Sequence, residues 1–290
     1  MSTAEPRYCY RHPDRETGLS CSECGRPICA DCATFAPVGI RCPDHAGVRR
    51  GAATKIRPRP VRRAPGIALA TGVAPITRAL IGINVVIYLI TVVQGHGGIN
   101  NPGGRLYVQW VLFGPLVAHG GWYRLVTSMF LHGFLLHIVF NMVALWFIGR
   151  PVEQYLGPVR YVGLYFVSGL AGAAGALLQA PLAPTVGASG AIFGILGAMM
   201  ILEWQITGRL AGQAMTWIVI NLVISFSFSG ISWGGHVGGL IGGILIMLAY
   251  AHWRDGRAQY GQIGIPGVLG LLAVAAGSVA IAYFRVRGYA

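Results

Sequence analysis

Acidic residues are scarce in this chain, and most of them lie near its start. Among 290 residues there are 9 acidic and 22 basic side chains, and charged residues make up only 11% of the whole. Beyond residue 45 the only carboxylates are Glu153, Glu203 and Asp255. With 54% hydrophobic residues and 43 glycines, this composition excludes a soluble globular domain and indicates a polytopic membrane protein.

The N-terminus lacks the apolar segment of a secretory signal, because residues 1–50 are polar throughout. We therefore expect no export of this end of the chain. The region holds all six cysteines and two histidines, arranged as four pairs with two residues inside each pair. The pairs are Cys9 and His12, Cys21 and Cys24, Cys29 and Cys32, and Cys42 and His45.

Eight such side chains can form two tetrahedral zinc sites, which would close a domain at 1–45 that is too small for a core of its own. Disulfides are the alternative, but they need an oxidising compartment. The order C-x2-H, C-x2-C, C-x2-C, C-x2-H resembles a B-box-type zinc finger. This resemblance implies interleaved ligand sets, Cys9, His12, Cys29 and Cys32 for one ion and Cys21, Cys24, Cys42 and His45 for the other. Spacing alone does not distinguish interleaved from sequential pairing.

A basic, proline-containing segment at 46–73 predicts an extended linker. Such a composition would suit a nucleic-acid-binding arm, but a polybasic segment beside a membrane span is better explained by contact with anionic lipid. We therefore expect no nucleic acid partner. The zinc domain should lie in the cytoplasm, where it would dock a protein partner or regulate the rest of a multi-pass protein of the cell membrane.

Seven apolar segments follow, each near the ~20 residues that a helix needs to cross the hydrocarbon core. They predict an all-α bundle with spans at 75–95, 124–148, 159–180, 189–204, 210–228, 234–252 and 264–284. The charged loops after the second, fourth and sixth spans then lie on the cytoplasmic side, in agreement with the positive-inside rule. Arg285 and Arg287 fall on the other side and count mildly against this topology.

Ser189 opens the fourth span within the sequence Gly187-Ala-Ser-Gly190. At a helix start, unsatisfied N–H groups and the positive end of the helix dipole favour a developing negative charge, which suits a nucleophile that forms an oxyanion. Simple N-capping and small-residue helix packing are the alternatives. On the sixth span, Gly239 and Gly243 lie within about 60° of His236, so close packing of the two spans could bring this imidazole to the Ser189 hydroxyl.

The second span carries the polar residues His132, His137 and Asn141. His137 and Asn141 share a helix face, whereas His132 lies about 140° from His137 and is expected to form structural hydrogen bonds between helices. A carboxylate to complete a triad is lacking, because Glu203 lies about 21 Å from Ser189 along a helix. The sequence therefore predicts a serine–histidine dyad. Its oxyanion donors would be His137, Asn141 and the backbone N–H groups near Gly187.

The combination of these residues resembles a rhomboid intramembrane serine protease. The matching positions are Gly187-Ala-Ser-Gly190 with Phe193, His132, His137 and Asn141, and His236 in its glycine-rich span. The resemblance implies Ser189 as nucleophile, His236 as base, an oxyanion hole from His137, Asn141 and the Ser189 N–H, and a supporting role for Arg124. It further implies a six-helix core at 74–254, an added seventh helix within 255–290, and no catalytic cofactor.

The predicted reaction is hydrolysis of peptide bonds in or near the transmembrane segments of membrane-protein substrates. Because a substrate helix must unwind to present its carbonyl group, we expect helix-weakening residues near the cut. Two other functions are weighed against this one. An inactive rhomboid-like protein could bind clients, or the zinc domain could be the main activity of a membrane-tethered adaptor.

Overall fold

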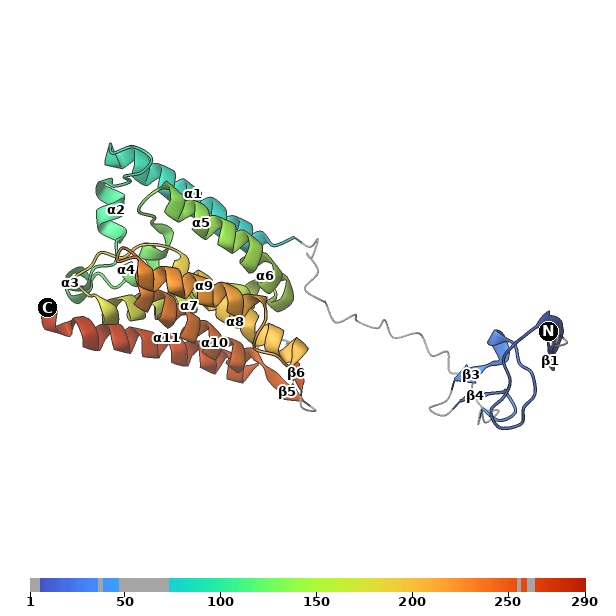
Figure 1. Cartoon of the computed structure of the whole chain (residues 1–290). Coiled ribbons are helices and arrows are strands. Elements are labelled where there is room, and N and C mark those ends of the chain that lie inside the picture. The colour runs from blue at the N-terminus through green and yellow to red at the C-terminus, as the bar shows by residue number, and fades with distance from the viewer. Residues whose placement is uncertain (1–5, 36–38, 47–72, 255–256, 260–263) are drawn as a thin grey trace. The chain divides into compact units, whose positions relative to one another are not determined.

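The structure is a computed structural model that describes residues 6–35, 39–46, 73–254, 257–259 and 264–290. The chain divides into two compact units, 1–65 and 66–290 (Figure 1). Apart from its two end residues, the predicted linker at 46–73 lies outside the described residues, as does Asp255.

The N-terminal unit is built from two small antiparallel hairpins and a short 3-10 turn. The hairpins pair β1 (Tyr8–Cys9) with β2 (His12–Glu16) and β3 (Thr34–Phe35) with β4 (Ile40–Arg41), and the turn spans Ala30–Cys32. Its buried apolar residues are Ile28 and five cysteines. A core made mostly of cysteine gives this unit little hydrophobic stabilisation.

The second unit is helical, and six helices among its described residues are long and apolar enough to cross a membrane. They are α1 (Pro75–Gly95), the continuous segment of α5 (Leu135–Ala144), a π turn (Leu145–Gly149) and α6 (Arg150–Leu156), then α7 (Pro158–Gln179), α8 (Ser189–Thr207), α10 (Trp233–Tyr250) and α11 (Ile265–Val286). The prediction of a mostly helical, multi-span fold preceded by a small Cys/His-rich region is confirmed.

Short elements fill the connections. They are α2 (Gly104–Trp110), α3 (Gly114–Ala118), α4 (Arg124–Thr127), 3-10 turns at Ser128–Phe130 and Arg287–Tyr289, and a hairpin of β5 (His252–Arg254) and β6 (Arg257–Gln259). The connection between α1 and α5 meets the start of α8, because Leu112 and Thr185 exchange two backbone hydrogen bonds of 2.9 and 3.1 Å.

The second span was predicted at 124–148, and this prediction is wrong at both ends. Extended backbone at Leu131 and Phe134 breaks the helix, so that the long segment starts at Leu135. It then continues past Pro151 to Leu156. A proline lacks the N–H that a regular helix needs, and the wider π turn just before it accommodates that missing donor.

The fifth apolar segment, predicted at 210–228, forms the shorter helix α9 (Gln213–Ser227). Its 15 residues reach only about 23 Å, less than the ~30 Å of a hydrocarbon core. Only Ala214, Ile218 and Ser225 are buried on it. In Figure 1, α9 lies beside α10, which packs along α11 on its other side, whereas α1 runs beside α5.

Glu153 was expected in a loop at the membrane surface, but it is buried within α6. Its carboxylate accepts hydrogen bonds from the backbone N–H groups of Ile76 and Thr77 at 2.9 and 2.7 Å, and from the Thr77 hydroxyl at 2.7 Å. These N–H groups belong to the first turn of α1, where no helical acceptor is available. Glu153 therefore fixes the start of α1 against the end of the second span.

Candidate functional site

Ser189 is the first residue of α8, and backbone hydrogen bonds hold the loop before it. The N–H of Gly187 donates to the carbonyl oxygen of Ser128 at 3.0 Å. Ala188 occupies the cap position, so Ser189 is not the N-cap that one alternative required. The N–H groups of the first turn, including that of Ser189, have no helical acceptor, and the helix dipole makes their surroundings favourable for negative charge.

Glycines allow α8 and α10 to pack backbone against backbone. A side chain at Gly239 would overlap the carbonyl oxygen of Gly190, and one at Gly243 would overlap that of Gly194. On the neighbouring helix α7, a Cβ atom at Gly172 would come 3.0 Å from the Cα atom of Gly190. This close approach brings the starts of α8 and α10 together.

The imidazole of His236 is held on three sides. Its Nε2 atom lies 2.8 Å from the Ser189 hydroxyl, and its Nδ1 atom lies 2.6 Å from the hydroxyl of Ser225 on α9. The ring of Phe193, one turn below Ser189, stacks on the imidazole with centroids 4.2 Å apart and planes at 15°. The structure thus brings the predicted serine, histidine and phenylalanine together.

Sequence reasoning missed Ser225. The residue follows Asn221 by four positions in a mostly apolar segment, and its hydroxyl lies 2.6 Å from the Asn221 carbonyl oxygen. Polar residues one turn apart in a membrane span were the signal that singled out His137 and Asn141. The same signal was present in the fifth span and would have identified Ser225 as a residue to explain.

His137 lies on the other side of Ser189. The N–H of Gly133 donates to its Nδ1 atom at 3.4 Å. Its Nε2 atom points toward Gly187, where an added Cβ would be 2.7 Å from Nε2 and 3.8 Å from the Ser189 hydroxyl. The Nδ2 atom of Asn141 donates to the carbonyl oxygen of His137 at 2.8 Å. His137 and Ser189 therefore both lie near the position that a side chain on Gly187 would occupy.

Gly187 leaves room for the His137 ring. Its φ of +127° lies in a region that side chains disfavour, and its own N–H is engaged by Ser128. The prediction that this N–H is a free donor is therefore wrong. The residue contributes space and a backbone shape that other residues would not adopt.

His132 lies before α5, in the extended turn, so the helical separation of 140° from His137 does not apply. It is fully buried, and its ring packs edge-on against that of His137 at 5.0 Å between centroids. Arg124 is also buried, and its Nη1 atom donates to the carbonyl oxygens of Val108 and Val111 at 2.8 and 2.9 Å. Arg124 thus ties α4 to the end of α2, away from the reacting atoms.

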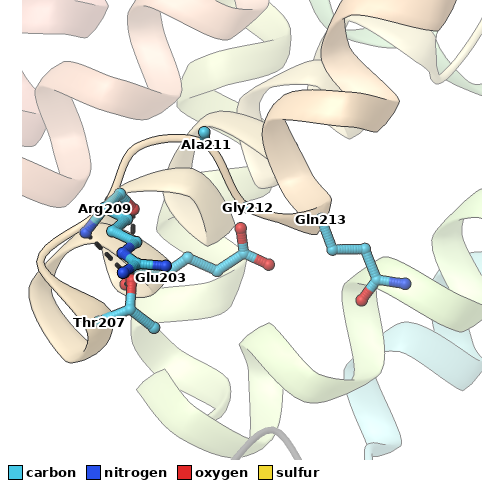
Figure 2. Close-up of a pocket in the computed structure, with 6 residues that line it drawn as sticks. All are labelled: Glu203, Thr207, Arg209, Ala211, Gly212 and Gln213. Carbon is cyan, nitrogen blue, oxygen red and sulfur yellow. Dashed lines mark hydrogen bonds between the residues drawn. The ribbon is translucent and has the colours of Figure 1, made fainter.

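Glu203 lies at the opposite end of α8 from Ser189. It lines a hollow of about 460 Å³ at the turn between α8 and α9. In Figure 2 its carboxylate is directed toward Gly212. The Oε2 atom accepts a hydrogen bond from the N–H of Ala214, in the first turn of α9, at 3.0 Å. This carboxylate stabilises the start of α9 and takes no part in the site around His236.

The eight Cys and His residues of the N-terminal unit form two interleaved clusters. They are Cys9, His12, Cys29 and Cys32, and Cys21, Cys24, Cys42 and His45. Within each cluster the ligand atoms all lie within 4.8 Å of one another. The pairing implied by the B-box resemblance is therefore the one in which these side chains meet.

The spacing of these atoms fits a tetrahedral ion. The Nδ1 atom of His12 lies 3.4 Å from the sulfur atoms of Cys29 and Cys32, and the Nδ1 atom of His45 lies 3.2 Å from that of Cys42. Tetrahedral zinc, with bonds of about 2.3 Å to sulfur and about 2.0 Å to nitrogen, places its ligands about 3.5–3.8 Å apart. The two clusters could therefore bind metal ions.

A polar contact joins the two ends of this unit. Asp44 accepts hydrogen bonds from the Tyr10 hydroxyl and from the guanidinium of Arg11, both at 2.9 Å. The bond from Tyr10 is the largest cause of a lowered pKa of the Asp44 carboxyl, which therefore stays charged and holds Arg11. Residues inside the first and last cysteine–histidine pairs are linked in this way.

Comparison with known proteins shows which family has similar sequences. Residues 119–253 match the family model of the Rhomboid domain. The chain is 36% identical over 166 residues to Rhomboid protease GluP of Bacillus subtilis (strain 168), covering 56% of this chain and 32% of that protein. It is 35% identical over 147 residues to Putative rhomboid protease YdcA of the same strain, covering 49% of this chain and 73% of that protein. The chain belongs to the rhomboid family.

This rhomboid protein is also 28% identical over 194 residues to Rhomboid-like protease 3 of Toxoplasma gondii, covering 64% of this chain and 72% of that protein. Its similarity to GluP, however, spans only 32% of that protein's length. The matched residues 119–253 contain Ser189 and His236, whereas the zinc-type clusters and α11 lie outside them. As a rhomboid with six candidate spans among its described residues, the chain is a multi-pass membrane protein.

Proposed function

We propose that this protein is an intramembrane serine endopeptidase with Ser189 as its nucleophile and His236 as its general base. The observation that carries the proposal is the 2.8 Å contact between the Ser189 hydroxyl and the Nε2 atom of His236. At this distance an imidazole can take the proton of an attacking hydroxyl. The stacked ring of Phe193 holds the base in the required plane.

In this mechanism the Ser189 oxygen attacks the carbonyl carbon of the scissile peptide bond while its proton moves to Nε2 of His236. The tetrahedral intermediate collapses when the same proton passes to the leaving amine and the C–N bond breaks. Water then attacks the acyl-serine, giving one proton to His236, which returns it to the Ser189 oxygen. Of the described carboxylates in this unit, Glu153 and Glu203 are engaged at the starts of α1 and α9 and do not assist these steps, so oxyanion stabilisation must carry more of the catalysis.

Three donors are available for the oxyanion. The Ser189 N–H lies at the start of α8 without a helical acceptor. Because the Gly133 N–H donates to Nδ1 of His137, the neutral ring carries its proton on Nε2, the atom beside Gly187. Asn141 uses one Nδ2 proton for the His137 carbonyl and keeps a second for the oxyanion. Gly187 serves by leaving room for His137, which in turn is packed by His132.

We further propose that the protein lies in the cell membrane with its N-terminal unit in the cytoplasm, so that Ser189 lies toward the outer surface. A substrate helix must unwind near that surface to expose its carbonyl group. Substrates with Gly or Pro near the cut and a small side chain before it should therefore be preferred.

For the N-terminal unit we propose two structural zinc ions in a B-box-type finger that docks a cytoplasmic protein. The ligand spacing supports the ions. Zinc would supply folding stability here and take no part in hydrolysis. Chelation should therefore release two zinc ions per chain and unfold residues 6–46 without changing the reactivity of Ser189.

The experiment that tests the proteolytic function is labelling in native membranes with a fluorophosphonate probe, which reacts with activated serines. Wild-type protein should be labelled and the Ser189→Ala variant should not. A model transmembrane substrate in liposomes should be cut by the wild type only. Absence of labelling in a folded wild-type protein would favour the inactive, client-binding function, for which the zinc unit would be the next region to study.

A further inference from the structure

The base of the proposed dyad touches a second serine that the mechanism above does not use. Ser225 lies on α9, is only 1% exposed, and approaches Nδ1 of His236 at 2.6 Å. We propose that Ser225 is a positioning residue that fixes the proton of His236 on Nδ1 and ties the base to helix α9. This inference rests on the proposed serine protease function.

The second partner of Ser225 shows which atom donates and which accepts in the contact with His236. Its hydroxyl oxygen also lies 2.6 Å from the carbonyl oxygen of Asn221, one turn earlier in α9. A carbonyl oxygen can only accept, so the single hydroxyl proton of Ser225 goes to Asn221. The Ser225 oxygen is then left to accept, and the group that faces it must donate. His236 therefore carries its proton on Nδ1.

A neutral imidazole protonated on Nδ1 has its lone pair on Nε2. Nε2 is the atom that lies 2.8 Å from the Ser189 hydroxyl, so it can accept the proton of the nucleophile. The other tautomer would present an N–H to Ser189 and could not act as a base. The hydrogen bonds therefore all point the same way. Ser189 donates to His236, His236 donates to Ser225, and Ser225 donates to the carbonyl oxygen of Asn221.

Ser225 keeps the same function throughout the reaction. When Nε2 receives the Ser189 proton, the ring becomes an imidazolium whose Nδ1–H still donates to the Ser225 oxygen. The proton that leaves later, toward the amine, departs from Nε2, and the Nδ1 proton stays in place. A neutral hydroxyl stabilises an imidazolium less than a carboxylate would, so Ser225 should contribute mainly by orienting the ring.

The contact also couples the base to the position of α9. Ser225 is one of three buried residues on that helix, with Ala214 and Ile218. The tautomer-setting partner of His236 is therefore supplied by a helix that few buried side chains hold. We infer that the base is fully positioned only while the end of α9 that carries Ser225 lies against α10.

Ser227 provides a matched control on the same helix. Its hydroxyl donates to the carbonyl oxygen of Val223 at 2.7 Å, the same one-turn bond that Ser225 makes to Asn221. Ser227 is exposed, however, whereas Ser225 is buried against His236. A purely helical role for such a serine would therefore affect both positions alike.

The test compares full-length wild type, Ser225→Ala, Ser225→Thr and Ser227→Ala in liposomes. Ser225→Ala should lower kcat for a model transmembrane substrate, and the rate of fluorophosphonate labelling, about tenfold, with KM unchanged. Ser225→Thr restores a hydroxyl and should recover most of the loss, whereas Ser227→Ala should match the wild type. Equal rates for Ser225→Ala and wild type would overturn the inference.

A second measurement does not depend on any Ser225 variant folding. Ring-¹⁵N NMR of histidine-labelled protein, with His236 assigned through a His236→Gln sample, reports which nitrogen carries the proton. The wild type should show protonated Nδ1, and a proton on Nε2 would overturn the inference. If the folded wild type reacts with no probe, the proposed protease function fails, while the NMR result still decides whether Ser225 sets the tautomer.

Discussion

Helices α8 and α9 both contact His236, but the protein holds them in different ways. In α8, 12 of 19 residues are buried, and its glycines lie against the backbone of α10. In α9, 3 of 15 residues are buried, and the helix is fixed near its two ends by Glu203 and by His236. Close packing of α8 thus fixes the position of Ser189. The Nδ1 side of His236, by contrast, contacts α9, a helix with few buried residues.

The largest effect should come from separating α8 and α10. Gly243→Leu would place a side chain on the carbonyl oxygen of Gly194, so the two helices must move apart and the contact between Ser189 and His236 should be lost. We expect probe labelling to disappear and the free energy of unfolding to fall by about 1–3 kcal/mol or more. Thermal denaturation together with labelling checks both.

Gly277→Leu on α11 is the matched control, because a Cβ atom there meets nothing within 4 Å. It should keep wild-type labelling and stability. If Gly243→Leu retained full labelling, packing at the glycines would not be what positions the nucleophile.

The next effect should come from the loop before α8. Gly187→Ala would force a side chain into a φ of +127° and against Nε2 of His137. Displacing one oxyanion donor costs about 10²–10³ in kcat, and we expect a loss of this size with α8 still in place. Steady-state cleavage of a model substrate measures it. Gly230→Ala, in an open loop position, should leave kcat within the error of the wild type.

A smaller effect should follow from loosening α9 alone. Glu203→Gln removes the negative charge at the start of α9 and should cost about 0.5–2 kcal/mol of local stability. Hydrogen–deuterium exchange should increase in peptides of α9 and stay unchanged in α1. Glu153→Gln should do the reverse, because Glu153 accepts three hydrogen bonds from the start of α1. Faster exchange at the Ser189 end of α8 after Glu203→Gln would contradict the distinction between the two helices.

The smallest effect should come from the exposed face of α9. Ile220 is 44% exposed, and Ile220→Ala should change the free energy of unfolding in detergent by less than about 0.5 kcal/mol. Ile218, two residues earlier, is 4% exposed, and the same substitution there should cost about 2 kcal/mol or more. A large loss in both variants would mean that α9 is held on more sides than the structure indicates.

Much of the membrane unit could be predicted from the sequence, because its causes are local. Long apolar segments set the helices, and the glycine faces around Ser189 and His236 indicated which of them pack closely. The start of the second span at Leu135 could not be predicted by hydropathy, since residues 124–134 are also mostly apolar and continue directly into the span. Within this stretch the helix is broken at Leu131 and Phe134, and the short helix before the break is tied by Arg124 to the distant carbonyl groups of Val108 and Val111.

The contacts of Glu153, Glu203 and Ser225 could not be predicted from the sequence, because they too depend on tertiary packing. Glu153 and Glu203 look like loop charges, and only the fold shows that each meets the first turn of another helix. Ser225 looks like an ordinary serine of a membrane span, and its partner is decided by how α9 lies against α10. Polar residues in apolar segments can be recognised from sequence, but the groups they bind are chosen by tertiary packing.

The alternation of the two Cys/His clusters along the chain affects how they can take up metal. Joining Cys9 to Cys29 closes a loop that contains Cys21 and Cys24, so binding of a first ion confines half of the second ligand set to a small volume. The effective concentration of those ligands rises, and the second ion should bind more tightly than the first. In native mass spectrometry we therefore expect chains with no ion or two ions and few with one, so that this unit would respond to zinc availability as a single switch.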